Sequence, residues 1–541
     1  MRWLLFWLWL ATLIGVTSVS LETHEVFVLE TARTMEVSGD WLMPQFNGAL
    51  RLNKPPMSYW CTAGLSRLDP FSADVQIWHG RFVSLAAGLL LVLATARIGT
   101  LLYNRETGFL AGLLLMCTQG FVHMTNSARP DPLYAALCLL QLLCWVEAYR
   151  KPDRSRRQWA FGVLGWFAAG LATLTKGPQV PVFFLIAWVA FLVRSRQGAR
   201  ILRVLRPAEG LVLCSLMCLP WWIVLHQRTL AVNIDLSDSQ LSGSLLMSLA
   251  GWRELLSLYY VRTLVALLVP VGVVALLMAP RIYKARAGLG DATRLLIYVC
   301  ATTLIVYSLG GHYRKHYLLP ILPLVVLLLA RALEVLVFPP LRKSAWNALT
   351  AALAVSLLGC VGLLLYRHAY WVLWVAPVYA LVLVVLAKRT LRTLPWARPS
   401  LRVQVATLAV PLAVVICVYN AFFPMSPWRA EEQLFAQRVG SALDKRDSVA
   451  EWQADLDLLP FFAERRVTLC ADLSAVKTWV AEKSAAGALY VVLPKSRLEE
   501  FAAAFHAQPL CSTQFTGRKK KDLVCVRIGQ AAPRPASPQT R

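Results

Sequence analysis

Residues 22–60 read ETHEVFVLETARTMEVSGDWLMPQFNGALRLNKPPMSYW and form the first polar stretch of the chain, directly after an apolar opening segment. This stretch contains several acids, a histidine, a Ser-Gly-Asp-Trp turn and a Lys-Pro-Pro run. Proton transfer and anion binding both require such ionisable side chains. We therefore expect the chemistry of the protein here, and we expect most of the remaining chain to be a scaffold.

The polar stretch has the pattern of two helices joined by turns. Residues 25–37 carry Val28, Thr31, Ala32 and Met35 at a spacing that places them on one helical face. Gly39 follows as a C-terminal cap. A second helix is expected at 57–68, because the preceding prolines suit a first helical turn. Two amphipathic helices lying on the membrane surface would explain this pattern.

The rest of the sequence is that of a membrane protein. Of its 541 residues, 57% are hydrophobic and 16% are charged, and the mean hydropathy is +0.54. A bilayer core of about 30 Å requires long apolar helices. We predict a polytopic α-helical membrane protein with about thirteen spans, near residues 3–21, 80–103, 108–125, 132–149, 159–174, 179–194, 211–227, 260–280, 294–310, 317–338, 347–366, 371–387 and 403–424. The first of these is expected to be a retained signal anchor rather than a cleaved signal peptide.

The net charge of +25 is distributed as membrane topology predicts. Basic residues gather in alternate loops, at 150–157, 194–206, 281–294, 342–343 and 388–402. This bias predicts a cytoplasmic N-terminus and places the polar stretch on the outer side. The distribution in short loops between spans also argues against nucleic-acid binding.

The composition becomes polar after Phe423. Residues 488–493 and 523–528 have the pattern of strands, and 474–483 and 496–505 that of helices, which predicts a small outer α/β domain. The tail 531–541 is expected to be disordered. Cys470, Cys511 and Cys525 lie in this region. Two of them could form a disulfide, but the sequence does not identify which two.

Three residues of the polar stretch are candidates for proton chemistry. Glu25 follows a span and could act as a general base, or it could be a helix N-terminal acid favoured by the dipole. His24 could share a proton, bind a metal or cap the helix. Asp40 is most simply a turn residue, and we assign it a supporting role.

The outer face also collects cations that the positive-inside rule does not explain. Lys54 stands at a helix start, where a phosphate would be stabilised by the lysine and by the helix N-terminus together. A phosphate-bearing substrate would also account for the other basic residues of this face, which are Arg81, Arg129, Lys176, Arg228, His312, Arg314, Lys315 and His316. Each of them alone could instead be an interfacial residue whose charged end reaches toward water. Asp131, between two prolines, could hold one of these cations or cap its own helix.

The motifs resemble one known family. They are E-T-A-R-x-M at 30–35, S-G-D-W at 38–41, P-x-x-N-G at 44–48, K-P-P-x-x-Y-W at 54–60, R-P-D-P at 129–132, T-K-G-P at 175–178, L-P-W at 219–221 and H-Y-L-L-P at 316–320. In this order they resemble the ArnT-like branch of the GT-C membrane glycosyltransferases, which is related to the protein O-mannosyltransferases. The resemblance covers roughly residues 20–335.

The resemblance implies transfer of a sugar, with inversion, from a polyprenyl-phosphate donor to a lipid or protein acceptor at the periplasmic face of a bacterial inner membrane. It implies a transmembrane domain at 1–424 with a first periplasmic loop at 22–79, and a periplasmic domain at 425–530. Lys54 matches the family lysine that contacts the donor phosphate, and Tyr317 matches a tyrosine near it. Membrane lipids are further expected partners. The sequence assigns no cofactor, and a divalent cation is left open.

The sequence departs from the family at informative positions. Members carry Asp-Glu where this chain has His24-Glu25, which leaves Glu25 as the candidate base. Asn53 replaces an acid, and Phe27-Val28 replaces an Arg-Tyr pair, of the aminoarabinose transferases. Only the reaction class therefore carries over, not the sugar or the acceptor. The alternatives are a flippase for a lipid-linked sugar, which would place polar sites near the bilayer midplane, and an inactive relative that binds the donor.

Overall fold

The computed structural model of the chain describes residues 2–10, 20–196, 198–231, 258–272, 279–280, 290–310, 313–335, 427–444, 446–483, 487–513 and 522–529, with single positions between 347 and 412. It divides into two compact units. Unit 1 comprises residues 1–19, 35–44 and 51–423, and unit 2 comprises residues 20–34, 45–50 and 424–541. The predicted spans 347–366, 371–387 and 403–424 and the predicted tail 531–541 lie outside the described residues.

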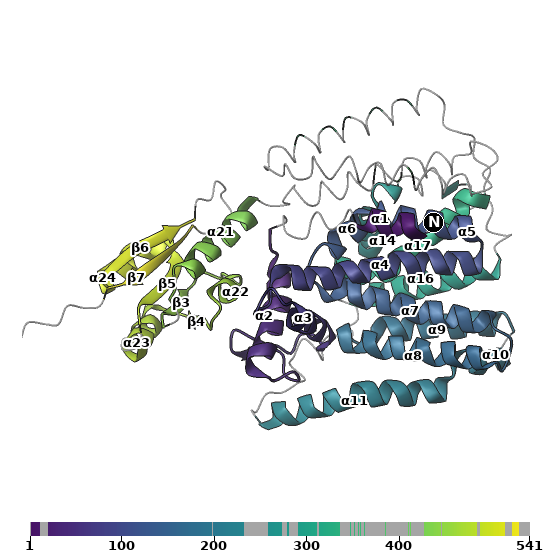
Figure 1. The fold of residues 1–541 in the computed structure, drawn as a ribbon, viewed down its shortest axis with the longest axis horizontal. Coiled ribbons are helices and arrows are strands. Elements are labelled where there is room, and N and C mark those ends of the chain that lie inside the picture. Colours follow the sequence, from purple (N-terminus) through teal and green to yellow (C-terminus); the bar gives the residue numbers. More distant parts are fainter. Residues whose placement is uncertain are drawn as a thin grey trace, which may run out of the picture. The chain divides into compact units, whose positions relative to one another are not determined.

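Unit 1 is a helical bundle (Figure 1). Its elements are α1 (Arg2–Leu10), α3 (Met57–Leu68), α4 (Ile77–Leu102), α5 (Arg105–Met116), α6 (Gln119–Thr125), α7 (Pro130–Arg150), α8 (Arg156–Lys176), α9 (Gln179–Arg194), α10 (Gly198–Leu205), α11 (Pro207–Ala231), α14 (Tyr259–Leu268), α16 (Asp291–Leu309), the 3-10 helix η4 (Lys315–Leu318) and α17 (Leu322–Val335). Helix α7 packs against α4 and α8, α8 against α11, and α9 against α16.

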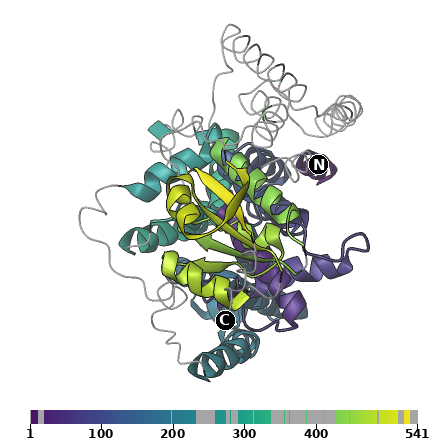
Figure 2. The same ribbon diagram turned by 90° about the vertical axis from the view of Figure 1, so that its left-hand side faces the viewer.

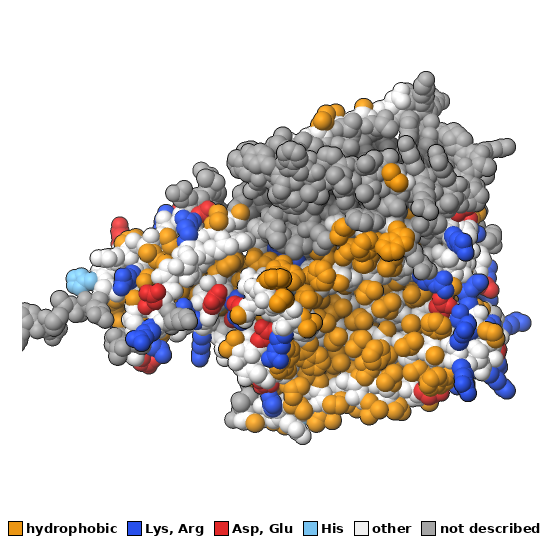
Figure 3. Space-filling model, in the orientation of Figure 1, with side chains coloured by type: hydrophobic (Ala, Val, Ile, Leu, Met, Phe, Trp, Pro, Cys, Tyr) orange, Lys and Arg blue, Asp and Glu red, His pale blue; other side chains and the backbone are white. Residues whose placement is uncertain are grey.

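Four helical stretches in the described part are long and apolar enough to cross a membrane, at Ile77–Leu102, Pro130–Arg150, Gly198–Ala231 and Asp291–Leu309. A broad hydrophobic surface lies on the described part of the visible face of the bundle (Figure 3). Exposed apolar side chains such as Phe167 on α8 and Ile186 on α9 are what lipid contact requires. The prediction of a helical membrane protein is confirmed, while the full number of spans stays a prediction.

One predicted span, 108–125, is divided into two helices. Helix α5 ends at Met116 and α6 begins at Gln119. Between them Thr118 forms a bridge with Pro270, and the backbone N–H of Gln119 donates to the carbonyl of Val269 at 2.8 Å. At the break, backbone pairing with Val269 and Pro270 replaces hydrogen bonds within the helix. Hydrophobic periodicity carries no signal of such pairing.

Basic side chains gather at one end of the bundle (Figure 3). Arg156 begins α8 and Arg194 ends α9, so these arginines mark the same end of two antiparallel helices. Asp153 pairs there with Arg203 at 2.8 Å. Because α8 has 21 residues, its two ends lie about 30 Å apart. Lys176, the last residue of α8, therefore lies at the opposite end from Arg156 and Arg194.

Helix α2 (Thr23–Ser38) confirms the first predicted helix of the polar stretch, and α3 confirms the second over the predicted residues. Val28, Thr31, Ala32 and Met35 are all buried, as their spacing predicts. Gly39 ends α2 with a φ of 70°, and its N–H donates to the carbonyl of Met35 at 3.0 Å. A positive φ is accessible to glycine without steric strain, which explains why the helix ends there.

Unit 2 contains a mixed five-stranded sheet in the order β4-β3-β5-β7-β6, seen from the front in Figure 2. Its elements are β3 (Ser448–Trp452), β4 (Thr468–Cys470), β5 (Leu489–Pro494), β6 (Ala507–Ser512), β7 (Leu523–Ile528), α21 (Pro427–Ser441), α22 (Leu459–Ala463), α23 (Leu473–Lys483), the 3-10 helix η5 (Lys495–Arg497) and α24 (Leu498–Ala504). β3 is parallel to β4 and β5, whereas β7 is antiparallel to β5 and β6. The strands predicted at 488–493 and 523–528 correspond to β5 and β7.

Unit 2 also takes in two segments of the polar stretch. These are the first part of α2 and the hairpin of β1 (Gln45–Phe46) and β2 (Ala49–Leu50). Asn47 and Gly48 turn the hairpin with φ values of 52° and 77°, as an Asn-Gly turn favours. The side chain of Asn47 exchanges two hydrogen bonds with the backbone of Val467. The polar stretch is thus divided between the two units.

Candidate active site

Lys176 and Asp131 form a buried ion pair in unit 1. Lys176 is the last residue of α8, and Asp131 lies in the first turn of α7. Both side chains are only 7% exposed, so each charge depends on the other for its stability away from water. Nε2 of His316 lies 4.0 Å from Oδ1 of Asp131. Three residues predicted for the site from separate motifs therefore meet at one point.

Tyrosine rings line this ion pair. The Lys176 ammonium lies 4.7 Å from the ring centre of Tyr317 and 5.7 Å from that of Tyr134, within the range of cation–π attraction. Tyr317 in turn stacks on Tyr307, with 5.0 Å between ring centres. The hydroxyl of Tyr134 accepts a hydrogen bond from the backbone N–H of Val180 at 3.0 Å. These contacts hold the lysine in a fixed position between a carboxylate and aromatic rings.

Lys54 belongs to the same electrostatic environment. Burial, assisted by the positive charge of Lys176, lowers the pKa of Lys54 to about 8, while the charge of Asp131 acts in the opposite direction. Arg51 and Arg314 lower the pKa of Lys54 further. The local electrostatic potential is therefore positive. A bound anion would be attracted here and would restore the pKa of the lysine to a higher value.

We name this group the cation cluster: Lys54, Lys176, Arg51, Arg129 and Arg314, with Asp131 among them. Within the described residues, its cations outnumber the single carboxylate that Asp131 contributes. Burial lowers the pKa of His316 to about 3, so its imidazole is neutral near pH 7 and adds no charge. The arrangement suits a ligand that carries at least one negative charge, since phosphate oxygens accept charge-assisted hydrogen bonds from lysine and arginine.

Three other predicted site residues have different surroundings. Arg81 is buried in α4, at 1% exposure. Lys315 is exposed and lies in η4 beside His316. Asp40 makes a turn, because its Oδ1 accepts hydrogen bonds from the N–H groups of Leu42 and Met43 at 3.1 and 3.3 Å.

The second carboxylate oxygen of Asp40 has a separate partner. Oδ2 of Asp40 pairs with Arg228 at 2.6 Å. The turn expected of Asp40 is thus present, together with an ion pair that joins residues 188 positions apart. Both contacts serve the local structure of unit 1.

Glu25 and His24 belong to unit 2, whereas the residues of the cation cluster belong to unit 1. Glu25 is fully buried, and its Oε2 accepts a hydrogen bond from the backbone N–H of Glu22 at 2.9 Å. This contact resembles a capping box, in which a third-position acid reaches back to the helix start. His24 is exposed, and its ring centre lies 6.2 Å from that of Phe27. Their catalytic roles stay predictions.

Two members of the site were missed in the sequence. Tyr134 lies three residues after Asp131 in α7, and this i, i+3 spacing could have indicated a shared helical face. Arg51 lies three residues before Lys54, and its side chain hydrogen-bonds to that of Tyr59 in α3. Among the residues that the structure describes, no three His, Cys, Asp or Glu side chains gather as metal ligands.

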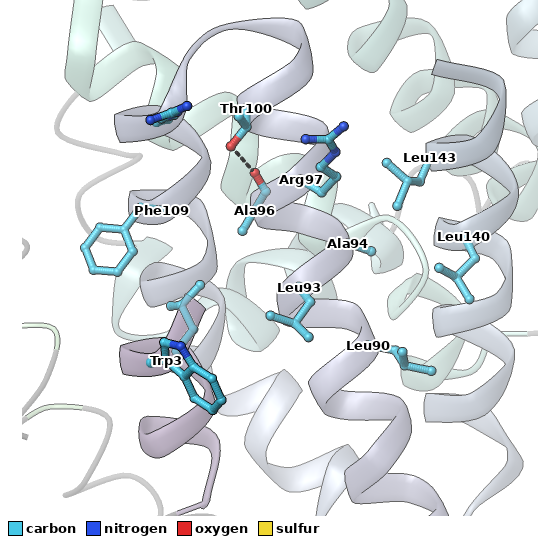
Figure 4. A pocket seen from close by; sticks show the side chains of 12 residues that line it. Trp3, Leu90, Leu93, Ala94, Ala96, Arg97, Thr100, Phe109, Leu140 and Leu143 are labelled. Carbon is cyan, nitrogen blue, oxygen red and sulfur yellow. Dashed lines mark hydrogen bonds between the residues drawn. The ribbon is translucent and has the colours of Figure 1, made fainter. Parts of the chain in front are cut away.

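A cavity of about 750 Å³ lies between α1, α4, α5 and α7. Its lining is largely apolar, with Leu90, Leu93, Leu140 and Leu143 along the walls and Arg97 at one end (Figure 4). Arg97 pairs with Glu147, so its charge is compensated. The residues predicted for the site do not line this cavity.

Known proteins are similar in sequence to the first half of the chain. Residues 5–234 match the family model described as dolichyl-phosphate-mannose-protein mannosyltransferase. A protein of Aquifex aeolicus (strain VF5) is 28% identical over 202 residues, covering 37% of this chain and 38% of that protein. The undecaprenyl phosphate-alpha-4-amino-4-deoxy-L-arabinose arabinosyl transferase of Pseudomonas savastanoi pv. phaseolicola is 26% identical over 200 residues, covering 37% of this chain. That alignment spans 36% of the transferase.

The fold is shared over nearly the whole chain. The crystal structure of ArnT from Cupriavidus metallidurans bound to undecaprenyl phosphate superposes with a TM-score of 0.70 at 16% identity, covering 97% of this chain and 98% of that one. The helical bundle and the α/β unit therefore have the fold of ArnT. The resemblance to ArnT-like membrane glycosyltransferases that the motifs indicate is confirmed.

Proposed function

We propose that the protein transfers a sugar from a polyprenyl-phosphate donor to a lipid or protein acceptor, with inversion at the anomeric carbon. The observation that carries this proposal is the cation cluster. Lys176 is buried, and Lys54, Arg51 and Arg129 are partly buried. Cations withdrawn from water in this way are costly unless they have an anionic ligand to bind. A polyprenyl phosphate combines such an anion with a tail that dissolves in the membrane.

The cluster would act on the leaving group. When the bond between the anomeric carbon and the phosphate oxygen breaks, negative charge grows on the departing polyprenyl phosphate. Lys54 and Lys176 are preorganised cations that stabilise this growing charge more than they stabilise the bound donor. Because a phosphate is already a good leaving group, no strong general acid is required. Arg129 and Tyr317 would support the phosphate, with Arg81, Lys315 and His316 in further supporting roles.

Glu25 is our candidate for the base. It would take the proton of an acceptor hydroxyl while the hydroxyl oxygen bonds to the anomeric carbon, or it would orient an acceptor that is already an anionic phosphate. A single displacement of this kind inverts the anomeric configuration. His24, in the place of the family aspartate, would at most assist. The support for Glu25 is its match to the family motif.

The names of the relatives support the donor class. One relative is named undecaprenyl phosphate-alpha-4-amino-4-deoxy-L-arabinose arabinosyl transferase, and the similar fold of ArnT was determined with undecaprenyl phosphate bound. Asn53 and Phe27-Val28 depart from the aminoarabinose transferases, so the proposal names the reaction class and leaves the sugar and acceptor open. A bacterial inner membrane is the proposed location, with a cytoplasmic N-terminus and unit 2 in the periplasm.

The experiment separates binding from transfer. Purified protein in proteoliposomes is given radiolabelled polyprenyl-phosphate sugar and acceptor lipids extracted from the source membranes, and binding of undecaprenyl phosphate is measured in parallel. Glu25→Gln should bind as the wild type does but lose at least about 100-fold in transfer. Lys54→Met should lose both the binding of undecaprenyl phosphate and the transfer of the sugar. Lys477→Met, which removes an exposed lysine of α23, is the matched control and should change neither.

Each alternative has its own result. Wild-type turnover by Glu25→Gln would remove that residue as the base. Movement of the lipid across the bilayer without any glycosylated product would favour a flippase. Donor binding by the wild type without transfer to any acceptor fraction would favour an inactive relative, as the His24 replacement suggests.

A further inference from the structure

Two cysteines of unit 2 face each other across neighbouring strands. Cys511 in β6 and Cys525 in β7 are direct partners in the antiparallel register, next to an irregularity between Pro509 and Cys511. Directly opposed residues of an antiparallel pair have Cα atoms about 4.5–5.5 Å apart. A disulfide requires about 4.4–6.8 Å. The backbone therefore already holds the two residues at a distance that a disulfide can span.

The side chains are also in contact. The two thiols hydrogen-bond to each other, which lowers the pKa of Cys511, and the charge of Arg438 on α21 lowers it further. The same hydrogen bond, together with burial, raises the pKa of Cys525. Cys511 is partly exposed, whereas Cys525 is fully buried. Cys511 is thus the thiol that an external oxidant can reach, and the one that ionises more readily.

We propose that Cys511 and Cys525 form a disulfide that ties the edge strand β6 to β7. The oxidant is a disulfide, either of a small thiol such as glutathione or of a thiol-oxidising protein. The Cys511 thiolate attacks one sulfur of that disulfide and releases one thiol. The Cys525 thiol then loses its proton and attacks the Cys511 sulfur, which releases the second thiol. Two electrons pass from the cysteines to the oxidant.

The sheet order selects this pair among the three cysteines of the unit. Cys470 lies in β4 at one edge, and β3 and β5 separate it from β7. Adjacent strands are about 4.8 Å apart, so Cys470 lies three strand spacings, or about 14 Å, from Cys525. That distance is too long for a disulfide without movement of the backbone. Cys470 is therefore expected to remain a thiol.

The position of β6 gives the bond a structural use. β6 is an edge strand, several of its side chains are exposed, and it contains Pro509 and a register shift. An edge strand with few buried side chains is held to its sheet mainly by backbone hydrogen bonds. A covalent link between Cys511 and Cys525 would keep β6 in register. This role is independent of the proposed glycosyl transfer.

The test uses the full-length protein purified in detergent. It is equilibrated with buffers of increasing ratio of oxidised to reduced glutathione, treated with N-ethylmaleimide, denatured, alkylated again and digested for mass spectrometry. We expect a peptide linked through Cys511 and Cys525, lost on reduction, with Cys470 alkylated throughout. In Cys511→Ser, Cys525 should appear alkylated and no linked peptide should form.

Two results would overturn the proposal. One is alkylation of both Cys511 and Cys525 at every glutathione ratio, which would show that the pair does not oxidise. The other is a linked peptide that contains Cys470. Because Cys511→Ser replaces a partly exposed side chain with one of nearly the same size, its folding can be checked by thermal unfolding beside the reduced wild type.

Discussion

Lys176 at the end of α8 and Asp131 at the start of α7 are buried counter-ions, although 45 positions separate them in the sequence. Their pairing brings the T-K-G-P and R-P-D-P motifs together at one end of the bundle. Since Lys176 also lies against Tyr317, the same lysine contacts a third motif, H-Y-L-L-P. Three short motifs that are each weak evidence alone therefore form one electrostatic site.

Asp131→Asn should destabilise the protein strongly. Removing one member of a buried ion pair leaves the other charge without its counter-ion, which costs about 3–5 kcal/mol of unfolding free energy. The amide keeps the shape of the side chain, so the loss would reflect charge. Thermal unfolding in detergent, with intrinsic tryptophan fluorescence as the signal, measures it.

The double variant Asp131→Leu with Lys176→Met separates stability from function. Apolar replacement of both partners should recover much of the stability lost in Asp131→Asn. The double variant should nevertheless bind undecaprenyl phosphate more weakly than the wild type, because it lacks the Lys176 ammonium. A double variant that binds the lipid as well as the wild type would contradict the role of Lys176 in the site.

The pH dependence of sugar transfer should follow the titration of the Lys54 ammonium. Because the pKa of Lys54 in the folded protein is lowered to about 8, the ammonium is charged below that pH and loses its proton above it. We expect kcat/KM to fall as pH rises through 8. In Lys54→Arg the guanidinium stays charged, so the decline should move beyond about pH 10. An unchanged high-pH limit in Lys54→Arg would assign the titration to another group.

Asp40→Asn should have a small effect. The asparagine keeps the oxygen that accepts from Leu42 and Met43, and it loses the ion pair with Arg228, which is partly exposed. Exposed ion pairs contribute about 0–1 kcal/mol. Transfer should therefore stay within about twofold of the wild type, in line with a turn residue. A loss of more than tenfold at unchanged stability would instead place Asp40 in the catalytic machinery.

Glu451→Gln should stabilise unit 2 at neutral pH. Burial raises the pKa of Glu451 to about 8, against an ordinary value of 4.5. The folded protein therefore holds a proton that the unfolded chain releases, and the stability from this group is lost as pH rises from 4.5 to 8. Glutamine keeps the oxygen that accepts from the N–H of Leu456.

The expected gain from Glu451→Gln is about 1–3 kcal/mol in unfolding free energy at pH 7. It should disappear below about pH 4.5, where the unfolded chain also holds the proton. Thermal unfolding of wild type and variant across this pH range measures the difference. A constant difference at all pH values would indicate a packing effect rather than titration.

Periodicity was sufficient for the local structure of several elements. The helix at Met57–Leu68, the end of α2 at Gly39 and the strand at Leu523–Ile528 were all predicted from residue patterns. Each depends on neighbouring residues alone, through side-chain spacing, proline geometry or the φ freedom of glycine. The break at Thr118 was missed because it depends on pairing with Pro270, far along the chain.

The candidate site was predictable in its members but not in its contacts. Lys54, Lys176, Asp131, His316 and Tyr317 were named from motifs, whereas Arg51 and Tyr134 were not. The sequence left open whether Asp131 held Arg129 or another cation, and the fold places Lys176 against it. The residues around Asp131 do not indicate its partner, because that partner, Lys176, belongs to another helix.

By itself, the sequence determined that this is a helical membrane protein, because the hydrophobicity of each residue contributes independently to this property. The placement of the basic loops on alternate connections stays a prediction. The sequence also indicated the ArnT-like resemblance and Glu25 and Lys54 as its chemical candidates. Only the tertiary structure decided that the polar stretch is divided between two units, that Lys176 pairs with Asp131, and that Cys511 faces Cys525. These three features depend on helix packing and strand register. Both arise from contacts between distant segments, and the sequence of a single segment does not predict such contacts.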